Sequence, residues 1–462
     1  MFVGRKNELD ILKDKIESDR FELGAIYGQR RIGKTSIIQE AIKDYNHIYF
    51  LSRLDTYHNN LHYFSNEFAK YVQMPYTPNF NTFDELFDAL IKYIGDKRVV
   101  IVIDELPFLA DGYPGILSYL QDLSDNLKRY NSLIKIILSG SDISFMLDVL
   151  NDRAKPLYQR VTFKIHVKEM IFSDAVNMLS GIDDEEIVKY LSIFGNRPYY
   201  LEKIDKKKDF MTNIIGLCFS NTSILIDAPN ITLPIGYSSN SVYIAILTAI
   251  ANHKQKVKEI ADYLNMDNNA ISTYLLRMFA GESIEKRETF NGNVKTNYYI
   301  ISDPFIRFYF RLISPNLPNI ERNLGKEIYN EKKNIINDII YHGFENVVNS
   351  YMDELNQNNE LPFVCNPFKK YDVSNSQLGR PIEIDGLAES LDKTKLIIIE
   401  DKYKNENVSI EVLNHLKESA SIFTGKYEEV YYYLFSKTGF TNELLNMKDS
   451  KVKLITIKDM LS

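Results

Sequence analysis

The chain is 462 residues long, carries a net charge of -7, and is 45% hydrophobic and 25% charged. This composition is that of an ordinary globular protein and excludes a disordered or fibrous chain, while the length exceeds one compact core and favours about three domains. The acidic balance excludes a protein that coats nucleic acid without selectivity, so any nucleic-acid contact must be confined to one region of the surface.

The first two hundred residues alternate apolar, strand-like runs with amphipathic helical stretches. Alternation of this kind predicts an α/β domain in which helices flank a parallel sheet. We expect this domain, together with a helical lid, to occupy residues 1–205. The four predicted strands span residues 21–28, 47–53, 98–105 and 133–141.

The segment GQRRIGKT, residues 28–35, matches the pattern GxxxxGK[ST] and lies between an apolar strand and a helical stretch. In this context glycines permit a tight turn, and successive backbone N–H groups wrap the β-phosphate of a nucleotide. Lys34 is predicted to reach the β- and γ-phosphates and the Thr35 hydroxyl to coordinate Mg²⁺. A chance glycine turn is the alternative, which the combination of strand, motif and helix disfavours. The predicted nucleotide-binding residues of this P-loop are Gly28, Gln29, Arg30, Arg31, Ile32, Gly33, Lys34, Thr35 and Ser36.

Two acidic residues follow the aliphatic run at residues 99–103. Asp104 would hold Mg²⁺ through water, and Glu105 would polarise the water that attacks the γ-phosphate. Glu105 and Lys34 are therefore the predicted catalytic residues of an ATPase, and Thr35 and Asp104 are its predicted metal-binding residues. Two charges that merely end a strand are the alternative, which the neighbouring P-loop disfavours.

Four further side chains are candidates for contacts with the phosphates. Ser139 and Ser141 end another apolar strand, where ATPases of this kind carry a polar residue that senses the γ-phosphate. A serine at the end of a strand is as often a turn residue, so both interpretations stay open. Arg160 and Arg197 are candidate cationic contacts, and ordinary surface arginines are the alternative for both.

Residues 206–240 are predicted to form a partly helical connector, and residues 241–318 a winged helix-turn-helix domain. The second prediction depends on two helices, at 259–266 and 268–280, that precede two strand-like runs. A helix that reads DNA needs side chains for base edges and cations for phosphates. The second helix offers little positive charge, so a packing or relay role is the leading alternative. The candidate DNA-facing residues are Asn268, Asn269, Ser272, Thr273 and Arg277, with Lys286, Arg287 and Lys295 on the wing beside Glu282 and Glu285.

Residues 319–462 contain a helix followed by a strand-rich α/β tail. In the tail, a period of two places Asp385 on the same face as Glu383, and Glu400 on the same face as Lys402, with Asp401 on the other. If the two strands pair as a hairpin, a carboxylate from each strand and the lysine converge. Such a cluster can hold Mg²⁺ or Mn²⁺ and orient the attacking water of a nuclease. Charged strand edges without any site are the alternative.

The segments FVGRKNEL, YGQRRIGKTS, VVIVIDEL, ILSGSDISFM, PLYQR and GNRPYYL, in that order, resemble the archaeal-type AAA-like ATPases of the signal-transduction P-loop NTPase class. This resemblance implies that the N-terminal segment sits against the adenine. Arg5 thereby becomes a nucleotide-binding residue, with Phe2, Val3 and Gly4 beside it.

The resemblance continues beyond the ATPase. Segments between residues 241 and 318 look like the winged-helix part of the same family, and YYLFSKTGFTNELL with VKLITIKDML looks like its C-terminal domain. That domain is commonly assigned to the PD-(D/E)xK nuclease-like fold. The resemblance implies that Asp385, Glu400 and Lys402 form the D…ExK centre and that Glu345 is a supporting acid of the metal site. Lys417 could meet a phosphate or simply face solvent.

The sequence thus predicts an ATP-binding and ATP-hydrolysing molecular switch that uses Mg²⁺ and is coupled to a nuclease-like domain. Two alternatives stay open: an ATP-regulated, Mg²⁺- or Mn²⁺-dependent DNA endonuclease, and a non-catalytic adaptor that binds nucleotide for structure. DNA, a protein partner and a second copy of the chain are candidate partners beyond ATP and ADP.

We expect a cytoplasmic protein without a membrane partner. The N-terminus lacks the apolar core of a signal peptide, and no run reaches the roughly 20 apolar residues of a membrane span. Cys218 and Cys365 show no CxxC or Cys/His spacing, which argues against a disulfide framework or a zinc site.

Overall fold

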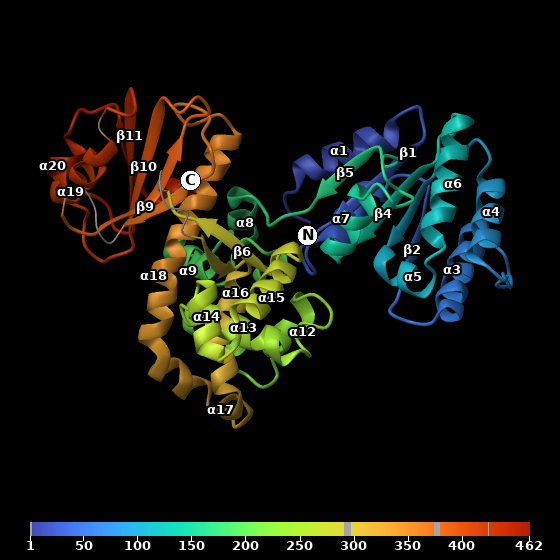
Figure 1. The fold of residues 1–462 in the computed structure, drawn as a ribbon, viewed down its shortest axis with the longest axis horizontal. Helices are drawn as coiled ribbons and strands as arrows, with labels where there is room; N and C mark the ends of the chain where they lie inside the picture. Colours follow the sequence, from blue (N-terminus) through green and yellow to red (C-terminus); the bar gives the residue numbers. More distant parts are fainter. Residues whose placement is uncertain (1, 291–296, 374–378, 424) are drawn as a thin grey trace. The chain divides into compact units, whose positions relative to one another are not determined.

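The computed structural model describes residues 2–290, 297–373, 379–423 and 425–462 (Figure 1). Within it the chain divides into two compact units. The domain limits predicted after residues 205, 240 and 318 describe a finer division than these two units and stay predictions. The first unit contains Met1–Lys168, Ile231–Ile235 and Ala280–Glu282, and the second contains Glu169–Asn230, Gly236–Phe279 and Ser283–Ser462.

A five-stranded parallel sheet forms the centre of the first unit, in the order β2-β3-β4-β1-β5 (Figure 1). Its central strands are continuous apolar runs because both faces of a parallel sheet are covered. The predicted parallel sheet is therefore confirmed, and it has one strand, β5, that we did not predict. The strands are β1 (Glu22–Tyr27), β2 (His47–Leu51), β3 (Val100–Asp104), β4 (Lys135–Gly140) and β5 (Phe163–His166).

Helices cover both faces of this sheet. One face packs against α1 and α2, and the other against α3 to α7, which bury the larger apolar core. The side chains of Thr56, Thr82 and Asp142 accept hydrogen bonds from the first turns of α3, α4 and α7, which fixes where these helices begin. The helices are α1 (Lys6–Glu17), α2 (Lys34–Ile42), α3 (Tyr57–Val72), α4 (Phe83–Ile94), α5 (Leu106–Gly112), α6 (Ile116–Arg129) and α7 (Ile143–Asn151).

The chain after β5 is mainly helical. A buried ion-pair cluster, in which Arg197 contacts Glu169 and Asp303, joins its first helices to a later one. These elements are α8 (Phe172–Met178), α9 (Asp184–Phe194), α10 (Pro198–Leu201), α11 (Phe210–Cys218), η1 (Ile224–Asp227), α12 (Ala228–Thr232), α13 (Ser241–Ala251), α16 (Pro304–Phe308), η2 (Tyr309–Ile313), η3 (Ser314–Asn316) and α17 (Leu317–Glu321).

Two helices and a hairpin lie where the sequence predicted them. The helices are α14 (Val257–Leu264) and α15 (Asn268–Ala280), and the strands β6 (Ile284–Glu288) and β7 (Asn297–Ile301) pair antiparallel. Part of the second predicted strand, with Lys295, lies outside the described residues. The order of elements agrees with the prediction, while the assignment to the winged-helix class stays a prediction.

A second, mixed sheet lies near the C-terminus, in the order β12-β11-β10-β9-β8. Strands β8, β9 and β10 pair antiparallel, whereas β10, β11 and β12 pair parallel. The predicted hairpin is therefore confirmed as β9 and β10, and α19 contributes to the apolar core beside it. The elements are α18 (Gly325–Gln357), β8 (Lys369–Val373), β9 (Ile382–Glu389), β10 (Lys395–Lys402), α19 (Ile410–Ala420), η4 (Ser421–Phe423), β11 (Glu429–Ser436), α20 (Asn442–Leu445), β12 (Val452–Thr456) and α21 (Ile457–Leu461). Among the helices that the structure describes, none has both the length and the apolar character needed to cross a membrane.

Candidate functional site

The loop between β1 and α2 is held in place by backbone and side-chain contacts on two sides. A Cβ atom at Gly28 would lie 2.3 Å from the carbonyl oxygen of Val167, so this position requires glycine. The buried guanidinium of Arg5 donates to the carbonyl oxygen of Ile32 at 2.9 Å and to that of Lys168 at 2.8 Å. Arg5 therefore contacts the P-loop, as expected of a residue near the nucleotide, but through the loop backbone.

Lys34 begins α2 and closes the loop from within. The preceding Gly33 has a φ of 102°, in the left-handed region that favours glycine. Lys34 is only 6% exposed, and its ammonium donates to the carbonyl oxygens of Gly28 and Gln29, at 2.9 Å each. Burial lowers the pKa of Lys34 to about 8, although the carboxylates of Glu105 and Asp104 oppose the shift. An anionic ligand in the loop would therefore stabilise the charged form of this lysine.

Asp104, at the end of β3, is a buried carboxylate that accepts three hydrogen bonds. Its Oδ2 accepts from the Thr35 hydroxyl at 2.9 Å and from the Tyr49 hydroxyl, and its Oδ1 accepts from the backbone N–H of Glu105 at 3.1 Å. Burial, and then the charge of Asp104, raises the pKa of Tyr49, so its hydroxyl keeps the proton that it donates. Nothing in the sequence points to Tyr49, because its role depends on β2 lying beside β3.

Glu105 adopts a left-handed backbone, with a φ of 56°, where it begins α5. Its Oε2 accepts hydrogen bonds from the backbone N–H of Ser141 at 3.1 Å and from the Ser141 hydroxyl at 2.8 Å. Ser141 therefore contacts the predicted catalytic carboxylate. Ser139 is fully buried opposite Ile26 of β1, and its hydroxyl has no hydrogen-bond partner within the described residues. A contact from Ser139 to a γ-phosphate stays a prediction.

The side chains at this edge of the sheet fit a magnesium nucleotide. The loop follows β1, Asp104 ends β3 and Ser139 lies near the end of β4, so they meet at the carboxyl ends of neighbouring parallel strands. A hydroxyl and a carboxylate, from Thr35 and Asp104, lie within 2.9 Å of each other, and hard oxygen donors of this kind suit Mg²⁺. Lys34 supplies the cation that the phosphates require.

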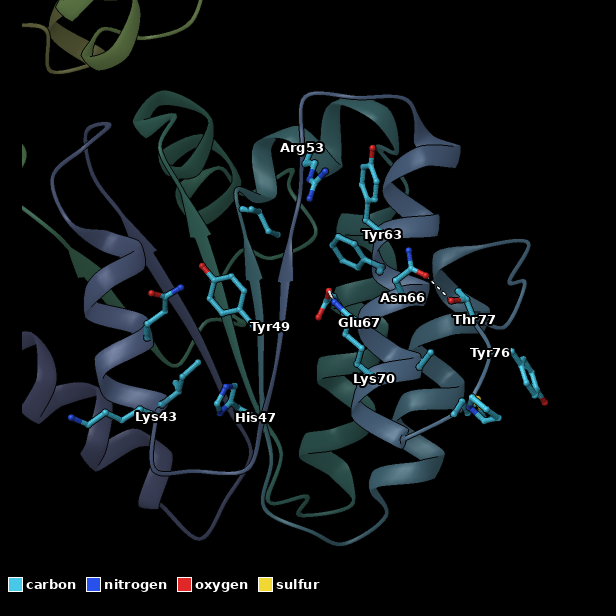
Figure 2. Close-up of a pocket in the computed structure, with 17 residues that line it drawn as sticks. Lys43, His47, Tyr49, Arg53, Tyr63, Asn66, Glu67, Lys70, Tyr76 and Thr77 are labelled. Atoms are coloured by element: carbon cyan, nitrogen blue, oxygen red, sulfur yellow. Dashed lines mark hydrogen bonds and ion pairs between the residues drawn. The ribbon is translucent and has the colours of Figure 1, made fainter. Parts of the chain in front are cut away.

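A separate cavity of about 930 Å³ follows the free edge of β2 between α2 and α3 (Figure 2). Tyr49 lines it, with Lys43 and His47 on the same side, while Arg53 lies over the ring of Tyr63 at 4.1 Å. Tyr49 thus has its ring in this cavity and its hydroxyl on Asp104. It is the side chain that joins the cavity to the predicted magnesium site.

Two arginines predicted near the phosphates have other partners. Arg160 pairs with Asp125 at 3.1 Å, and Thr162, two residues later, bonds the carbonyl oxygen of Leu23 near the start of β1. Arg160 therefore lies near the N-terminal ends of the strands, whereas the P-loop follows the C-terminal end of β1. The structure does not bring Arg160 to the nucleotide site. Arg197 belongs to the second unit, where its guanidinium is buried against Glu169 at 2.8 Å and Asp303 at 3.1 Å.

The hairpin in the second unit brings Asp385, Glu400 and Lys402 together. Gly386 of β9 lies opposite Ile399 of β10, which places Asp385 beside Glu400. The Lys402 ammonium forms a hydrogen-bonded ion pair with the Glu400 carboxylate. The convergence predicted for these three side chains is thus present in the structure.

Burial dominates the electrostatics of this carboxylate–lysine centre. It raises the pKa of Glu400 to about 7, a shift that Asp385 increases and Lys402 opposes. It also raises the pKa of Asp401 well above the usual value, and Asp385 and Glu345 add to this shift. Asp401 Oδ2 has no hydrogen-bond partner in the described part of the chain. Asp401, although it alternates with Glu400 along β10, is therefore electrostatically part of the centre, which the strand periodicity alone did not indicate.

Glu345, the predicted supporting acid, lies on α18 and is coupled to the centre by charge. Lys370 Nζ lies 3.9 Å from Glu345 Oε2 and 2.5 Å from Glu383 Oε1. Burial raises the pKa of Glu345, Lys370 opposes the shift, and Asp385 adds to it.

A metal site is not assembled around these carboxylates. Asp385 Oδ2 accepts a hydrogen bond from the backbone N–H of Asp401 at 3.0 Å. Across residues 2–290, 297–373, 379–423 and 425–462, no group of three or more His, Cys, Asp or Glu side chains is arranged to hold a metal ion. The second metal predicted on Asp385, Glu400 and Glu345 therefore does not fit the donors as they stand. Lys417, a candidate phosphate contact, instead pairs with Asp449 at 3.2 Å.

The predicted recognition helix, α15, presents a mixed surface. The hydroxyls of Ser272 and Thr273 donate to carbonyl oxygens one turn earlier in the same helix. Leu276 and Phe279 are exposed on it, at 67% and 49%. An exposed apolar surface with few cations suits a packing role at least as well as contact with phosphates.

Comparisons with known proteins add to this geometry. Residues 2–204 match the model of an ATPase domain predominantly from Archaea, and residues 309–437 match a model of archaeal and bacterial proteins of unknown function. The uncharacterized protein MJECL04 of Methanocaldococcus jannaschii is 32% identical over 407 residues, which is 88% of each chain.

Solved structures are more distant. A Walker-type ATPase of Pyrococcus abyssi aligns over 67% of this chain and 96% of its own, with 21% identity and a TM-score of 0.49. The ORC2 protein of Aeropyrum pernix, in ADPNP–ADP complexes, aligns over 69% of this chain and 94% of its own, with 12% identity and a TM-score of 0.44. The chain belongs to the family of the Methanocaldococcus jannaschii protein, and its N-terminal part is a P-loop ATPase domain of the predominantly archaeal type.

Proposed function

We propose that the protein binds ATP with Mg²⁺, hydrolyses it, and uses the nucleotide state to switch its nuclease-like C-terminal domain. The observation that carries the proposal is the arrangement of Lys34, Thr35 and Asp104 around one loop. A buried ammonium lies inside the loop, and a hydroxyl and a carboxylate face each other at its edge. Glu105 lies next to this set, at the end of the same strand as Asp104.

Different side chains of the site have different roles in hydrolysis. Lys34 and the loop N–H groups bind the phosphate oxygens, and Thr35 with Asp104 would hold Mg²⁺, which neutralises phosphate charge when bound. Glu105, once it exchanges its hydrogen bonds from Ser141 for a water molecule, orients that water toward the γ-phosphorus. A bond forms from the water oxygen to phosphorus, the bond to the β–γ bridging oxygen breaks, and the products are ADP and phosphate.

Loss of the γ-phosphate on hydrolysis is the proposed source of the switch. The γ-phosphate and its contacts exist in only one nucleotide state, and differential contacts of this kind bias a two-state element. We assign the output to the C-terminal domain because the residues of its carboxylate–lysine centre converge.

Steady-state phosphate release tests the ATPase. Lys34→Ala should lower the rate by about 100-fold or more, because it removes the phosphate-binding cation from the site. Lys43→Ala is the matched control: this lysine lies just beyond α2, is paired with Glu40 at 2.6 Å, and should be neutral. Equal rates for wild type and Lys34→Ala, in preparations free of contaminating ATPase, would sink the proposal.

A metal-dependent DNA endonuclease is the second candidate. The convergence of Asp385, Glu400 and Lys402 favours it, and metal binding there requires that the Lys402 ammonium first leave the Glu400 carboxylate. The test is cleavage of labelled DNA with Mg²⁺ or Mn²⁺, with and without ATP. Glu400→Gln should abolish cleavage, whereas Glu406→Gln, which removes an exposed carboxylate from the following loop, should not. Absence of cleavage by wild type under every nucleotide and metal condition would leave the tail as an interaction domain.

The remaining proposals concern partners. ATP binding without measurable hydrolysis would favour an adaptor that recruits a protein partner or a second copy of the chain.

We keep DNA contact by the winged-helix region as a proposal, with α15 as the helix that would make it. Loss of DNA binding in Asn268→Ala/Asn269→Ala, with unchanged unfolding temperature, is the outcome that supports it.

A further inference from the structure

A cavity of about 740 Å³ lies within the second unit, between the β6–β7 hairpin, α16, α18 and β8. We call it the Arg307 cavity. It is separate from the P-loop, which belongs to the first unit, and neither ATP binding nor hydrolysis accounts for it. The basic residues that line it include Arg287, Arg307, Lys256 and Lys370.

Arg307 is half-buried, and among the described residues its guanidinium has neither a hydrogen-bond nor an ion-pair partner. Burial lowers the pKa of Arg307, repulsion from Arg287 and Arg311 lowers it further, and Glu345 opposes the shift. Arginine nevertheless remains charged in proteins. A partly desolvated charge that is repelled by neighbouring cations costs stability, and an anionic ligand would remove that cost.

The other cations near Arg307 are already engaged. Arg287 contacts Glu285 at 3.2 Å, Arg311 contacts Asp338 at 2.8 Å, and Lys370 is held by Glu383 and Glu345. Lys256 Nζ lies 4.0 Å from Glu259 Oε1. Among the described cations named here, Arg307 is therefore the one that is left for a ligand.

The acidic residues of the wall limit what can bind. Glu259, Glu345 and Asp372 also line the cavity, so it is not a general cationic surface. Glu259 is itself occupied, because its Oε2 accepts from the backbone N–H groups of Gln255 and Lys256. A compact anion beside Arg307 fits this lining better than an extended polyanionic surface would.

We propose that the Arg307 cavity binds a phosphate group, which Arg307 holds through its guanidinium fork. The planar fork presents two parallel N–H groups that match two phosphate oxygens. The phosphate belongs either to a nucleic-acid strand or to a free nucleotide. Glu345 lies on the cavity wall and is coupled by charge to Asp385, so the bound phosphate lies next to the carboxylate–lysine centre.

Binding is measured in the full chain carrying Lys34→Ala, so that the P-loop does not bind the probes and failure of the ATPase proposal leaves this test intact. One arm follows the anisotropy of a fluorescein-labelled DNA hairpin, and the other titrates AMP and inorganic phosphate by calorimetry. Arg307→Gln should weaken the binding affinity measured in one of the two arms by about ten-fold, the size expected for a lost charge-assisted hydrogen bond. Arg322→Gln removes an exposed arginine after α17 and should change neither.

The two arms identify the source of the phosphate. Weakening confined to DNA assigns a nucleic-acid strand, and weakening confined to AMP or phosphate assigns a free nucleotide or phosphate. Unchanged affinity in both arms, or no binding of any probe, overturns the proposal.

A measurement on the unmutated cavity covers the case in which Arg307→Gln does not fold. Phenylglyoxal modification of Arg307 and Arg322, read by mass spectrometry, should slow at Arg307 alone when the bound probe is present. Equal modification of Arg307 with and without DNA, AMP or phosphate contradicts a phosphate at this site.

Discussion

Two buried acidic centres in this protein are stabilised in different ways. At the P-loop, Asp104 accepts hydrogen bonds from two neutral hydroxyls and one backbone N–H. At the C-terminal hairpin, Glu400 is paired with a lysine, and further carboxylates crowd around it. The donors to the first carboxylate are uncharged, so an incoming cation displaces no ion-pair partner from among them. The second is already compensated within the protein.

This difference explains why only one centre fits a metal ion as it stands. Binding Mg²⁺ near Asp104 requires the exchange of weak hydrogen bonds for stronger contacts. Binding a metal at Glu400 requires the displacement of the Lys402 ammonium and the ionisation of a group whose pKa is about 7. The match to the archaeal ATPase model supports the ATPase centre, whereas the matching model for the C-terminal part describes proteins of unknown function.

The largest expected effect sharpens the assignment of the first centre. Glu105→Gln should lower ATP turnover by about 100- to 1,000-fold while ATP still binds, because the amide cannot orient and polarise water as the carboxylate does. Phosphate release and equilibrium binding of a fluorescent ATP analogue measure the two quantities. Asp96→Asn, at an exposed carboxylate after α4, is the control. Parallel losses of binding and turnover would show that Glu105 has another role.

The next prediction tests whether the Lys34 ammonium at the first centre loses its proton at mildly alkaline pH. The pKa of Lys34 without ligand is about 8, below its usual value, whereas bound phosphate stabilises the ammonium. ADP affinity should therefore be constant below pH 8 and fall as pH rises above it, by up to about ten-fold per pH unit. Titration of ADP between pH 7 and 10 measures this. Lys34→Arg stays charged and should show a flat profile; a wild-type profile as flat as that of Lys34→Arg would contradict the shift.

The third prediction concerns internal compensation in the second centre. The pKa of Glu400 is about 7 in the folded protein and lower when unfolded, so its ionisation costs folding stability as pH rises through 7. Lys402 reduces that cost. Lys402→Met should destabilise the fold by about 1–3 kcal/mol at pH 8 and by less at pH 5, where Glu400 is protonated. Urea unfolding at both pH values gives the difference, and Lys404→Met, on the exposed loop, should show none. A pH-independent loss would point to packing instead.

The smallest expected effect is that of Tyr49→Phe. Because the hydrogen bond from Tyr49 to Asp104 must be exchanged when Mg²⁺ binds, its removal should lower the Mg²⁺ concentration for half-maximal turnover by about three- to ten-fold, the size of one hydrogen bond. The unfolding temperature should change little, because the ring stays in place. Tyr63→Phe, which removes a hydroxyl from the far side of the same cavity, is the matched control. Equal changes in both variants would show that the effect does not pass through Asp104.

Local patterns explain what the sequence predicted well. The P-loop motif and the acidic end of β3 depend on residues close together in the chain, and strand alternation was enough to find the hairpin that joins Asp385 to Glu400. Local patterns did not indicate the contact of Tyr49 or the position of Arg160. The contact of Tyr49 with Asp104 depends on the order of strands, and the position of Arg160 depends on which end of β1 its segment meets.

The electrostatics of the tail were also beyond local patterns. Asp401 alternates with Glu400 along the strand, yet burial and the charge of Asp385 join it to the same centre. The isolation of Arg307 arises because helices and a hairpin from separate parts of the chain leave its guanidinium without a partner among the described residues. A pattern of residue types does not show which neighbouring side chains already form ion pairs or hydrogen bonds with other residues.

The contact of Arg5 with Ile32 and Lys168 has a consequence for synthesis on the ribosome. The guanidinium joins positions that are separated by 27 and 163 residues along the chain. A nascent chain emerges N-terminus first, so Arg5 and the loop leave the ribosome long before Lys168 does. The P-loop can therefore gain all of its contacts with Arg5 and Lys168 only after the whole first sheet has emerged. Nucleotide binding by stalled nascent chains of increasing length would then report when this domain has folded.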